Sequence, residues 1–155
     1  MEQEIYILVG GIGTGKSTYA KKLKREQGLN ILCPDKIEEQ YQNCSENEID
    51  KIIDRELKNY LNSGESFILD GKCLTRRERI DIINRANQNG YVVYGYDFGV
   101  GNIVSLLNRL RQPRGQPRKR WEAVYEDEKH LYEPPELKEG FERIYYPIFF
   151  NLITK

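Results

Sequence analysis

Eight consecutive residues near the start of the chain have the types and the spacing of a phosphate-binding loop. Residues 10–17 read GGIGTGKS and match the pattern G-x-x-x-x-G-K-[ST] at each fixed position. Glycines allow a backbone to fold around a phosphate with its N–H groups pointing inward. Lys16 supplies a positive charge for the β- and γ-phosphates, and the Ser17 hydroxyl is suited to ligate Mg²⁺. The pattern predicts that a nucleotide is held by Gly10, Gly11, Ile12, Gly13, Thr14, Gly15, Lys16, Ser17 and Thr18.

A carboxylate directly follows the apolar run at residues 66–69. Asp70 after a buried strand is typical of a Walker-B-like site, in which an aspartate holds Mg²⁺ directly or through water. The same pattern also arises from ordinary turn chemistry, so the metal role and a turn role are both open. Ser17 and Asp70 are therefore the two candidate metal ligands of the chain.

Two further carboxylates follow predicted strands. Asp35 lies two residues past the second strand, after Pro34, where a carboxylate can accept the proton of an acceptor hydroxyl as a general base. Its alternative role is the N-cap of a helix that begins at Lys36. Asp97 is interpreted as structural or as lying on the substrate side.

An arginine-rich segment occupies residues 109–120, around a loop rich in proline and glycine at 112–117. Arginine forks match the charge that phosphoryl transfer spreads over phosphate oxygens, so Arg109 and Arg114 are candidate catalytic residues on a lid over about 111–119. A solvated basic face and a nucleic-acid contact are the alternatives. A following acidic stretch would neutralise this charge; it comprises Glu122, Glu126, Asp127 and Glu128.

Short apolar runs alternate with amphipathic segments along the chain. Strands are expected over 5–9, 29–33, 66–69, 91–96 and 141–146, and helices over 18–24, 46–62, 75–89, 102–111 and 118–131. This alternation predicts an α/β fold: a three-layer P-loop NTPase fold with a parallel sheet of about five strands, helices on both faces and the arginine-rich lid. Ligands of such sheets bind beyond the carboxyl ends of the strands.

Composition favours one cytoplasmic domain over residues 1–155. Lys+Arg and Asp+Glu are 24 each, which does not favour binding nucleic acid by charge alone. The mean hydropathy is −0.70, no apolar run approaches the roughly 20 residues of a membrane span, and the acidic start does not resemble a signal peptide. Three cysteines without C-x-x-C spacing predict free thiols; they are Cys33, Cys44 and Cys73.

Several stretches together resemble the kinase domain of the polynucleotide 5′-hydroxyl kinase family and its bacterial and phage P-loop kinase relatives. They are the loop GGIGTGKST at 10–18, Asp35, the run at 69–79, the segment NRLRQPRG at 108–115 and the segment YEPPELKEGF at 132–141. The resemblance implies that Lys16 and Ser17 hold phosphates and Mg²⁺, that Asp35 is the general base, and that Asp70 lies near the metal or the acceptor. It also implies that Arg114, with Arg109, contacts the phosphates of ATP.

One position departs from that family's pattern. The family has D-x-x-R after the base, whereas this chain has Asp35-Lys36-Ile37-Glu38. A carboxylate at 38 would repel the phosphate of a nucleic-acid acceptor. The expected function is an ATP- and Mg²⁺-dependent phosphotransferase acting on a hydroxyl, foremost a polynucleotide 5′-hydroxyl. The alternatives are a kinase of a small metabolite or nucleoside and a non-catalytic ATP-binding module.

Overall fold

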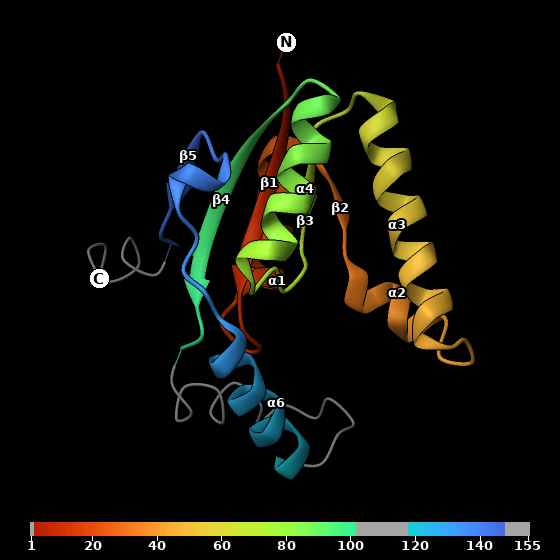
Figure 1. Ribbon diagram of the computed structural model, residues 1–155, viewed down its shortest axis with the longest axis vertical. Helices are drawn as coiled ribbons and strands as arrows, with labels where there is room; N and C mark the ends of the chain where they lie inside the picture. Colours follow the sequence, from red (N-terminus) through yellow and green to blue (C-terminus); the bar gives the residue numbers. More distant parts are fainter. Residues whose placement is uncertain (1, 102–117, 148–155) are drawn as a thin grey trace.

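The computed structural model describes residues 2–101 and 118–147, and its frame is a five-stranded parallel sheet (Figure 1). The strands lie in the order β2-β3-β1-β4-β5, and each neighbouring pair is parallel. Their bounds are β1 Gln3–Gly10, β2 Asn30–Leu32, β3 Phe67–Leu69, β4 Tyr91–Gly99 and β5 Arg143–Tyr145. The α/β fold expected from the sequence is therefore confirmed.

The central strand β1 carries the core on both of its faces. Ile5, Ile7, Leu8 and Val9 have no exposed surface, as expected for a parallel strand covered on both sides. Alternate residues point to opposite faces, so Ile5, Ile7 and Val9 belong to one buried cluster and Tyr6 and Leu8 to the other.

Helices cover both faces of the sheet and make it the middle of three layers (Figure 1). On one face, α3 (Glu46–Ser63) contributes Leu57 and Leu61, and α4 (Arg76–Gln88) contributes Ile83 and Ala86. On the other face, α1 (Lys16–Gln27) packs through Ala20 and Leu23. The helix α6 (Arg118–Leu131) lies beyond the carboxyl ends of the strands, and its bounds match the prediction.

Local sequence explains where the helices begin, but α2 begins earlier than the sequence predicted. Ser45 and Thr75 form capping boxes with Glu48 and Glu78, which explains where α3 and α4 start. The helix α2 (Pro34–Gln40) starts earlier than expected: Cys33 is its N-cap and Pro34 its first residue. Asp35 lies within the first turn, so its interpretation as an N-cap was wrong.

The last part of the fold differs from the prediction in two details. The strand expected over 141–146 is confined to Arg143–Tyr145, and a 3₁₀ turn, η1 (Leu137–Glu139), precedes it. Tyr145 packs on Tyr96 with ring centroids 4.9 Å apart. The helix predicted over 102–111 lies outside the described residues, and so does most of the predicted lid.

A fully buried ion pair joins α4 to η1. Arg79 donates from Nε to Glu139 Oε2 over 2.7 Å and from Nη2 to Oε1 over 2.9 Å. Its Nη1 donates to the carbonyl oxygens of Cys73 and Leu74 at 2.8 and 3.0 Å. Both side chains are 0% exposed, so every charge here is taken from water and paired.

Among the helices in the described ranges, none combines the length and the apolar character that a membrane span requires.

Candidate phosphate-transfer site

The phosphate-binding loop joins β1 to α1 at the carboxyl edge of the sheet. Gly15 is the N-cap of α1 with φ 96°, a conformation that glycine adopts without the penalty a side chain would bring. The Gly10 N–H donates to the Lys72 carbonyl over 3.2 Å, and the Gly11 N–H donates to the Gly99 carbonyl over 2.9 Å. The loop is therefore held between the segment after β3 and the end of β4.

The N-terminus of α1 faces this loop and favours an anion. The helix is 12 residues long, begins at Lys16 and has no acidic residue in its first turn. Its first N–H groups have no carbonyl partner within the helix, and the helix dipole adds partial positive charge there. This is the usual physical basis for phosphate binding at a helix N-terminus.

Ser17 and Asp70 meet at this end of the sheet. The Ser17 hydroxyl donates to Asp70 Oδ2 over 2.9 Å, although the two residues are 53 positions apart. Asp70 is 6% exposed, and burial raises the pKa of its carboxyl, against the opposing effects of the Ser17 hydrogen bond and the Lys16 charge. Both candidate metal ligands predicted from the sequence thus lie in contact.

The chemistry of these two groups fits Mg²⁺. A hydroxyl and a carboxylate are hard oxygen donors, and Mg²⁺ in nucleotide sites takes one or two such ligands together with phosphates and waters. Within the described ranges, no group of three or more His, Cys, Asp or Glu side chains forms a self-sufficient metal cage.

Carboxylates from three separate segments of the chain act electrostatically on Lys16. Its ammonium donates to the Gly10 carbonyl. Burial lowers its pKa below the usual lysine value, while the charges of Asp70, Glu128 and Asp35 oppose that shift, in decreasing order. Asp35, on the α2 side of the sheet, is therefore close enough to act electrostatically on the loop lysine.

Asp35 and Glu38 are successive acidic positions on α2, and both are exposed. Burial of part of the Glu38 side chain raises its pKa, and repulsion from Asp35 adds to the shift, while Lys72 opposes it. The position that departs from the D-x-x-R pattern therefore adds negative charge beside the candidate base.

Asp97 is structural. Its carboxylate accepts hydrogen bonds from the Tyr132 hydroxyl at 2.9 and 2.8 Å and from the Gly99 N–H at 2.9 Å. It thereby ties the end of β4 to the residue that follows α6. Of the two interpretations of Asp97, the structure supports the structural one.

Glu128 is a residue that sequence reasoning missed. It was interpreted as part of an acidic stretch that neutralises neighbouring arginines, but it is 4% exposed and accepts from the Ile12 N–H over 2.6 Å. Its only sequence signal is that four acidic residues occur in a short stretch, which does not distinguish it from exposed Glu126 and Asp127. Arg109 and Arg114 lie outside the described residues.

The three cysteines are free thiols, as expected. Burial raises the pKa of Cys73 to about 12 and also raises that of the partly exposed Cys33. Neither environment lowers a thiol pKa, as nucleophilic cysteine chemistry would require.

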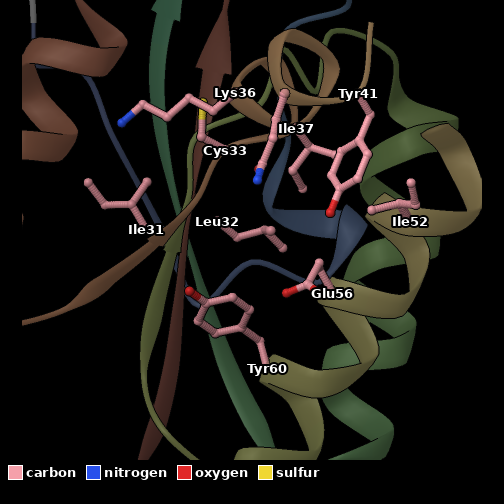
Figure 2. A pocket seen from close by; sticks show the side chains of 10 residues that line it. Ile31, Leu32, Cys33, Lys36, Ile37, Tyr41, Ile52, Glu56 and Tyr60 are labelled. Carbon is pink, nitrogen blue, oxygen red and sulfur yellow. The ribbon is translucent and has the colours of Figure 1, made fainter. Parts of the chain in front are cut away.

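A cavity of about 340 Å³ opens between β2, α2 and α3 (Figure 2). Its apolar lining comes from Ile31, Leu32, Ile37 and Ile52, and its polar groups from Cys33, Lys36, Gln40, Tyr41, Glu56 and Tyr60. Tyr41 and Tyr60 lie on opposite sides of the space in Figure 2. Because Cys33 and Lys36 flank Pro34 and Asp35 in the chain, the cavity adjoins the segment that carries the candidate base.

The sheet order, the loop between β1 and α1 and the buried aspartate after β3 together define a P-loop fold of the kinase type. The sequence pattern of the AAA_33 family, described as an AAA domain, matches residues 5–135, and this chain belongs to that family.

The chain is also similar to one curated protein and to many solved structures. Adenylate kinase 2 of Plasmodium falciparum (isolate 3D7) is 28% identical over a 100-residue alignment that covers 59% of this chain and about a third (35%) of that protein. A sugar kinase from Janibacter sp. HTCC2649 superposes with TM-score 0.64 at 16% identity, covering 99% of this chain and 94% of that one.

Two further structures show the same likeness. Kti12 of Chaetomium thermophilum, solved with ADP-AlF3, gives TM-score 0.64 at 16% identity over 92% of this chain and 87% of its own. A gluconokinase from Sinorhizobium meliloti 1021 gives TM-score 0.60 at 15% identity over 92% and 81%. At these identities the likeness establishes the fold alone.

Proposed function

We propose that this protein transfers the γ-phosphate of ATP to the hydroxyl of an acceptor molecule. The observation that carries the proposal is the contact between Ser17 and Asp70, 2.9 Å long, beside the loop lysine and the start of α1. That arrangement brings a phosphate-binding backbone, a cation and two Mg²⁺-type ligands to one place. The kinases among the similar proteins support the same reaction class.

In this proposal each described residue has a role at a stated atom. The backbone N–H groups at the start of α1 and the Lys16 ammonium hold the phosphates and stabilise the charge of the transferring group. Asp35 accepts the proton of the acceptor hydroxyl. The hydroxyl oxygen then bonds to the γ-phosphorus as the bond from that phosphorus to the β-phosphate oxygen breaks, leaving ADP. Ser17 and Asp70 would hold Mg²⁺, which neutralises phosphate charge when bound. Arg109 and Arg114 are proposed to approach the phosphates from a lid.

The first candidate acceptor is a polynucleotide 5′-hydroxyl. It rests on the resemblance of the loop, Asp35, the run at 69–79 and the segment at 108–115 to polynucleotide kinases. The exposed carboxylate of Glu38 stands where that family has an arginine, and it works against a polyanionic acceptor.

The second candidate acceptor is a small hydroxylated molecule such as a metabolite or nucleoside. The cavity between β2, α2 and α3 favours it, because about 340 Å³ is within the range of small-molecule sites. Its mixed lining, with Lys36 and Glu56 as its charged groups, suits a compact polar molecule better than a charged backbone.

An acceptor screen with ATP labelled at the γ-phosphate separates these candidates. The panel contains 5′-hydroxyl DNA and RNA oligonucleotides, nucleosides, sugars and sugar acids. Label transfer to oligonucleotides alone supports the first candidate, and transfer to small molecules alone supports the second. ATP binding with no transfer to any acceptor would instead indicate a non-catalytic ATP-binding module and would overturn the proposed reaction.

The base is tested by Asp35→Asn. We expect transfer to fall by about 10²- to 10⁴-fold while ATP affinity stays within about twofold, because general-base catalysis contributes that much and the base does not hold the donor. Glu39→Gln, an exposed carboxylate on the same helix, is the matched control and should leave both quantities unchanged. Near-normal turnover of Asp35→Asn with the true acceptor would show that another group takes the proton.

A further inference from the structure

The carboxylate of Glu128 occupies a position against the phosphate-binding loop. Its Oε2 accepts the Ile12 N–H over 2.6 Å, a contact between residues 116 positions apart. The side chain reaches the loop from α6, which lies beyond the carboxyl ends of the strands (Figure 1). An N–H of the loop expected to receive an anionic ligand is therefore already bound to an anion that belongs to the chain itself.

Within the described residues 2–101 and 118–147, the pairing of this buried carboxylate is incomplete. Lys72 Nζ lies 3.4 Å from Oε1, but half of the lysine side chain is exposed to solvent. In the described part of the chain, Oε1 receives no hydrogen bond, although Glu128 is 4% exposed. A buried carboxylate is normally satisfied at both oxygens, because removing its charge from water is costly. The contact is thus held less firmly than its burial suggests.

The loop is shaped to admit this carboxylate. A Cβ at position 11 would lie 3.0 Å from Glu128 Oε2 and 3.5 Å from Val100 Cγ1, so a side chain there would crowd the carboxylate. Glu128 also contributes to the electrostatic environment of Lys16, the residue expected to reach the β- and γ-phosphates. Glu128 and the terminal phosphate of a nucleotide would therefore act on the same cation with charges of the same sign.

We propose that Glu128 is an internal anionic ligand of the phosphate-binding loop that competes with the terminal phosphate of ATP. The inference rests on the proposed function, because it requires the loop to bind a nucleotide triphosphate. Binding of ATP displaces the Glu128 carboxylate from Ile12 and Lys72, so the affinity of the loop for the donor is lower than it would be with a neutral residue at 128.

The decisive variant is Glu128→Gln. A glutamine keeps the shape and an oxygen that can accept the Ile12 N–H, but it removes the charge. Calorimetric titration with Mg²⁺ and β,γ-imido-ATP should show about tenfold tighter binding than the unaltered chain. The gain should be smaller for ADP, which lacks the γ-phosphate. Glu126→Gln, an exposed carboxylate on the same helix, makes the same change in net charge and should leave both affinities unchanged.

A purely structural tie between α6 and the loop makes the opposite prediction. In that case Glu128→Gln would bind the ATP analogue as tightly as the unaltered chain or more weakly, and either result overturns the proposal. An affinity gain for ADP equal to that for the ATP analogue would overturn it as well. Glu128→Met, similar in volume and uncharged, is the second variant if the glutamine variant does not fold, and failure of both to fold would show a structural requirement instead. If the unaltered chain itself does not bind ATP, the proposed function fails rather than this inference.

Discussion

Two buried glutamates, Glu139 and Glu128, differ in how completely they are paired. Glu139 is 0% exposed at its side chain and accepts two hydrogen bonds from Arg79 and a third from the Glu136 N–H. Glu128 has nearly the same burial, but among the described residues it accepts one backbone hydrogen bond, at the phosphate-binding loop, and its second oxygen faces a lysine at 3.4 Å without hydrogen bonding. The first ties α4 to η1, and the second touches the candidate site.

This difference in pairing distinguishes the carboxylate of Glu139, which stabilises the fold, from that of Glu128, which a ligand is proposed to displace. Both carboxylate oxygens of Glu139 accept hydrogen bonds from within the protein, although Arg76 Nε, 3.7 Å from Oε1, has no hydrogen-bond partner among the described residues. Glu128 contacts the loop N–H of Ile12 and the half-exposed Lys72 and acts electrostatically on Lys16; in the proposed function the loop and Lys16 also bind phosphate. Changes at the Arg79–Glu139 pair should therefore alter folding, and changes beside the loop should alter phosphate chemistry.

The largest effect is expected at Lys16. Lys16→Met should lower the transfer rate by about 10³-fold or more, because a preorganised cation next to the transferring phosphate contributes on that scale. Steady-state kinetics with γ-labelled ATP measures it, and Lys21→Met, an exposed lysine of the same helix, is the control. Activity close to that of the unaltered chain would remove the loop from the proposed chemistry.

Lys16→Met also tests whether a residue beside the loop affects phosphate transfer without supporting the stability of the fold. Burial lowers the pKa of Lys16, so the folded chain binds fewer protons than the unfolded chain between that lowered pKa and 10.5. The charged ammonium therefore costs stability at neutral pH, and that cost is relieved as the pH rises through this window. We expect Lys16→Met to unfold in urea with at least the free energy of the unaltered chain at pH 7, and the difference to narrow toward pH 10.5.

The next effect is expected at the fully paired glutamate. Glu139→Gln leaves the Arg79 guanidinium buried without its counter-charge, and we expect a loss of about 3–5 kcal/mol of unfolding free energy. Urea denaturation followed by circular dichroism measures the loss. Glu142→Gln, an exposed carboxylate three residues on, should change stability by less than about 0.5 kcal/mol. A loss under about 1 kcal/mol for Glu139→Gln would contradict the structural assignment of the pair.

A double-mutant cycle measures the interaction between Arg79 and Glu139 directly, and the expected energy is smaller than the loss in the single variant. Arg79→Met combined with Glu139→Gln should destabilise less than the sum of the single variants, by about 2 kcal/mol, since the second change removes no remaining ion pair. The double variant should still be less stable than the unaltered chain, because the carbonyls of Cys73 and Leu74 lose their donor. Simple additivity would show that the two side chains do not act as a pair.

The smallest effect is expected at the start of α4, the helix that carries Arg79. Thr75→Ala removes the hydroxyl that accepts the Glu78 N–H over 3.2 Å, and we expect a loss of about 1 kcal/mol. Thr75→Ser keeps the acceptor and should recover most of that loss. Thermal unfolding measures both variants, and equal melting temperatures for all three chains would show that the capping box does not contribute.

Much of the site was predictable because its signals are local. The loop at 10–17 has glycines where the backbone turns. Asp35 and Asp70 each follow a predicted apolar strand, and this position predicts that they lie at the carboxyl edge of the sheet. That rule places the two candidate metal ligands, Ser17 and Asp70, at the same edge, and the structure has a hydrogen bond between them. The N-cap assignment of Asp35 failed because Pro34, which suits the first position of a helix, lets α2 begin two residues earlier than the expected start at Lys36.

The sequence by itself determined the strand-loop-helix unit and the parallel α/β fold, because those depend on neighbours within a few residues and on apolar periodicity. Only the tertiary structure decided which acidic residues are buried and what they face. Glu128 and Ile12 are 116 positions apart, and Arg79 and Glu139 are 60 apart. Those contacts exist because packing brings α6 and η1 against the sheet, and no local pattern distinguishes a carboxylate that will be buried there from one left in water.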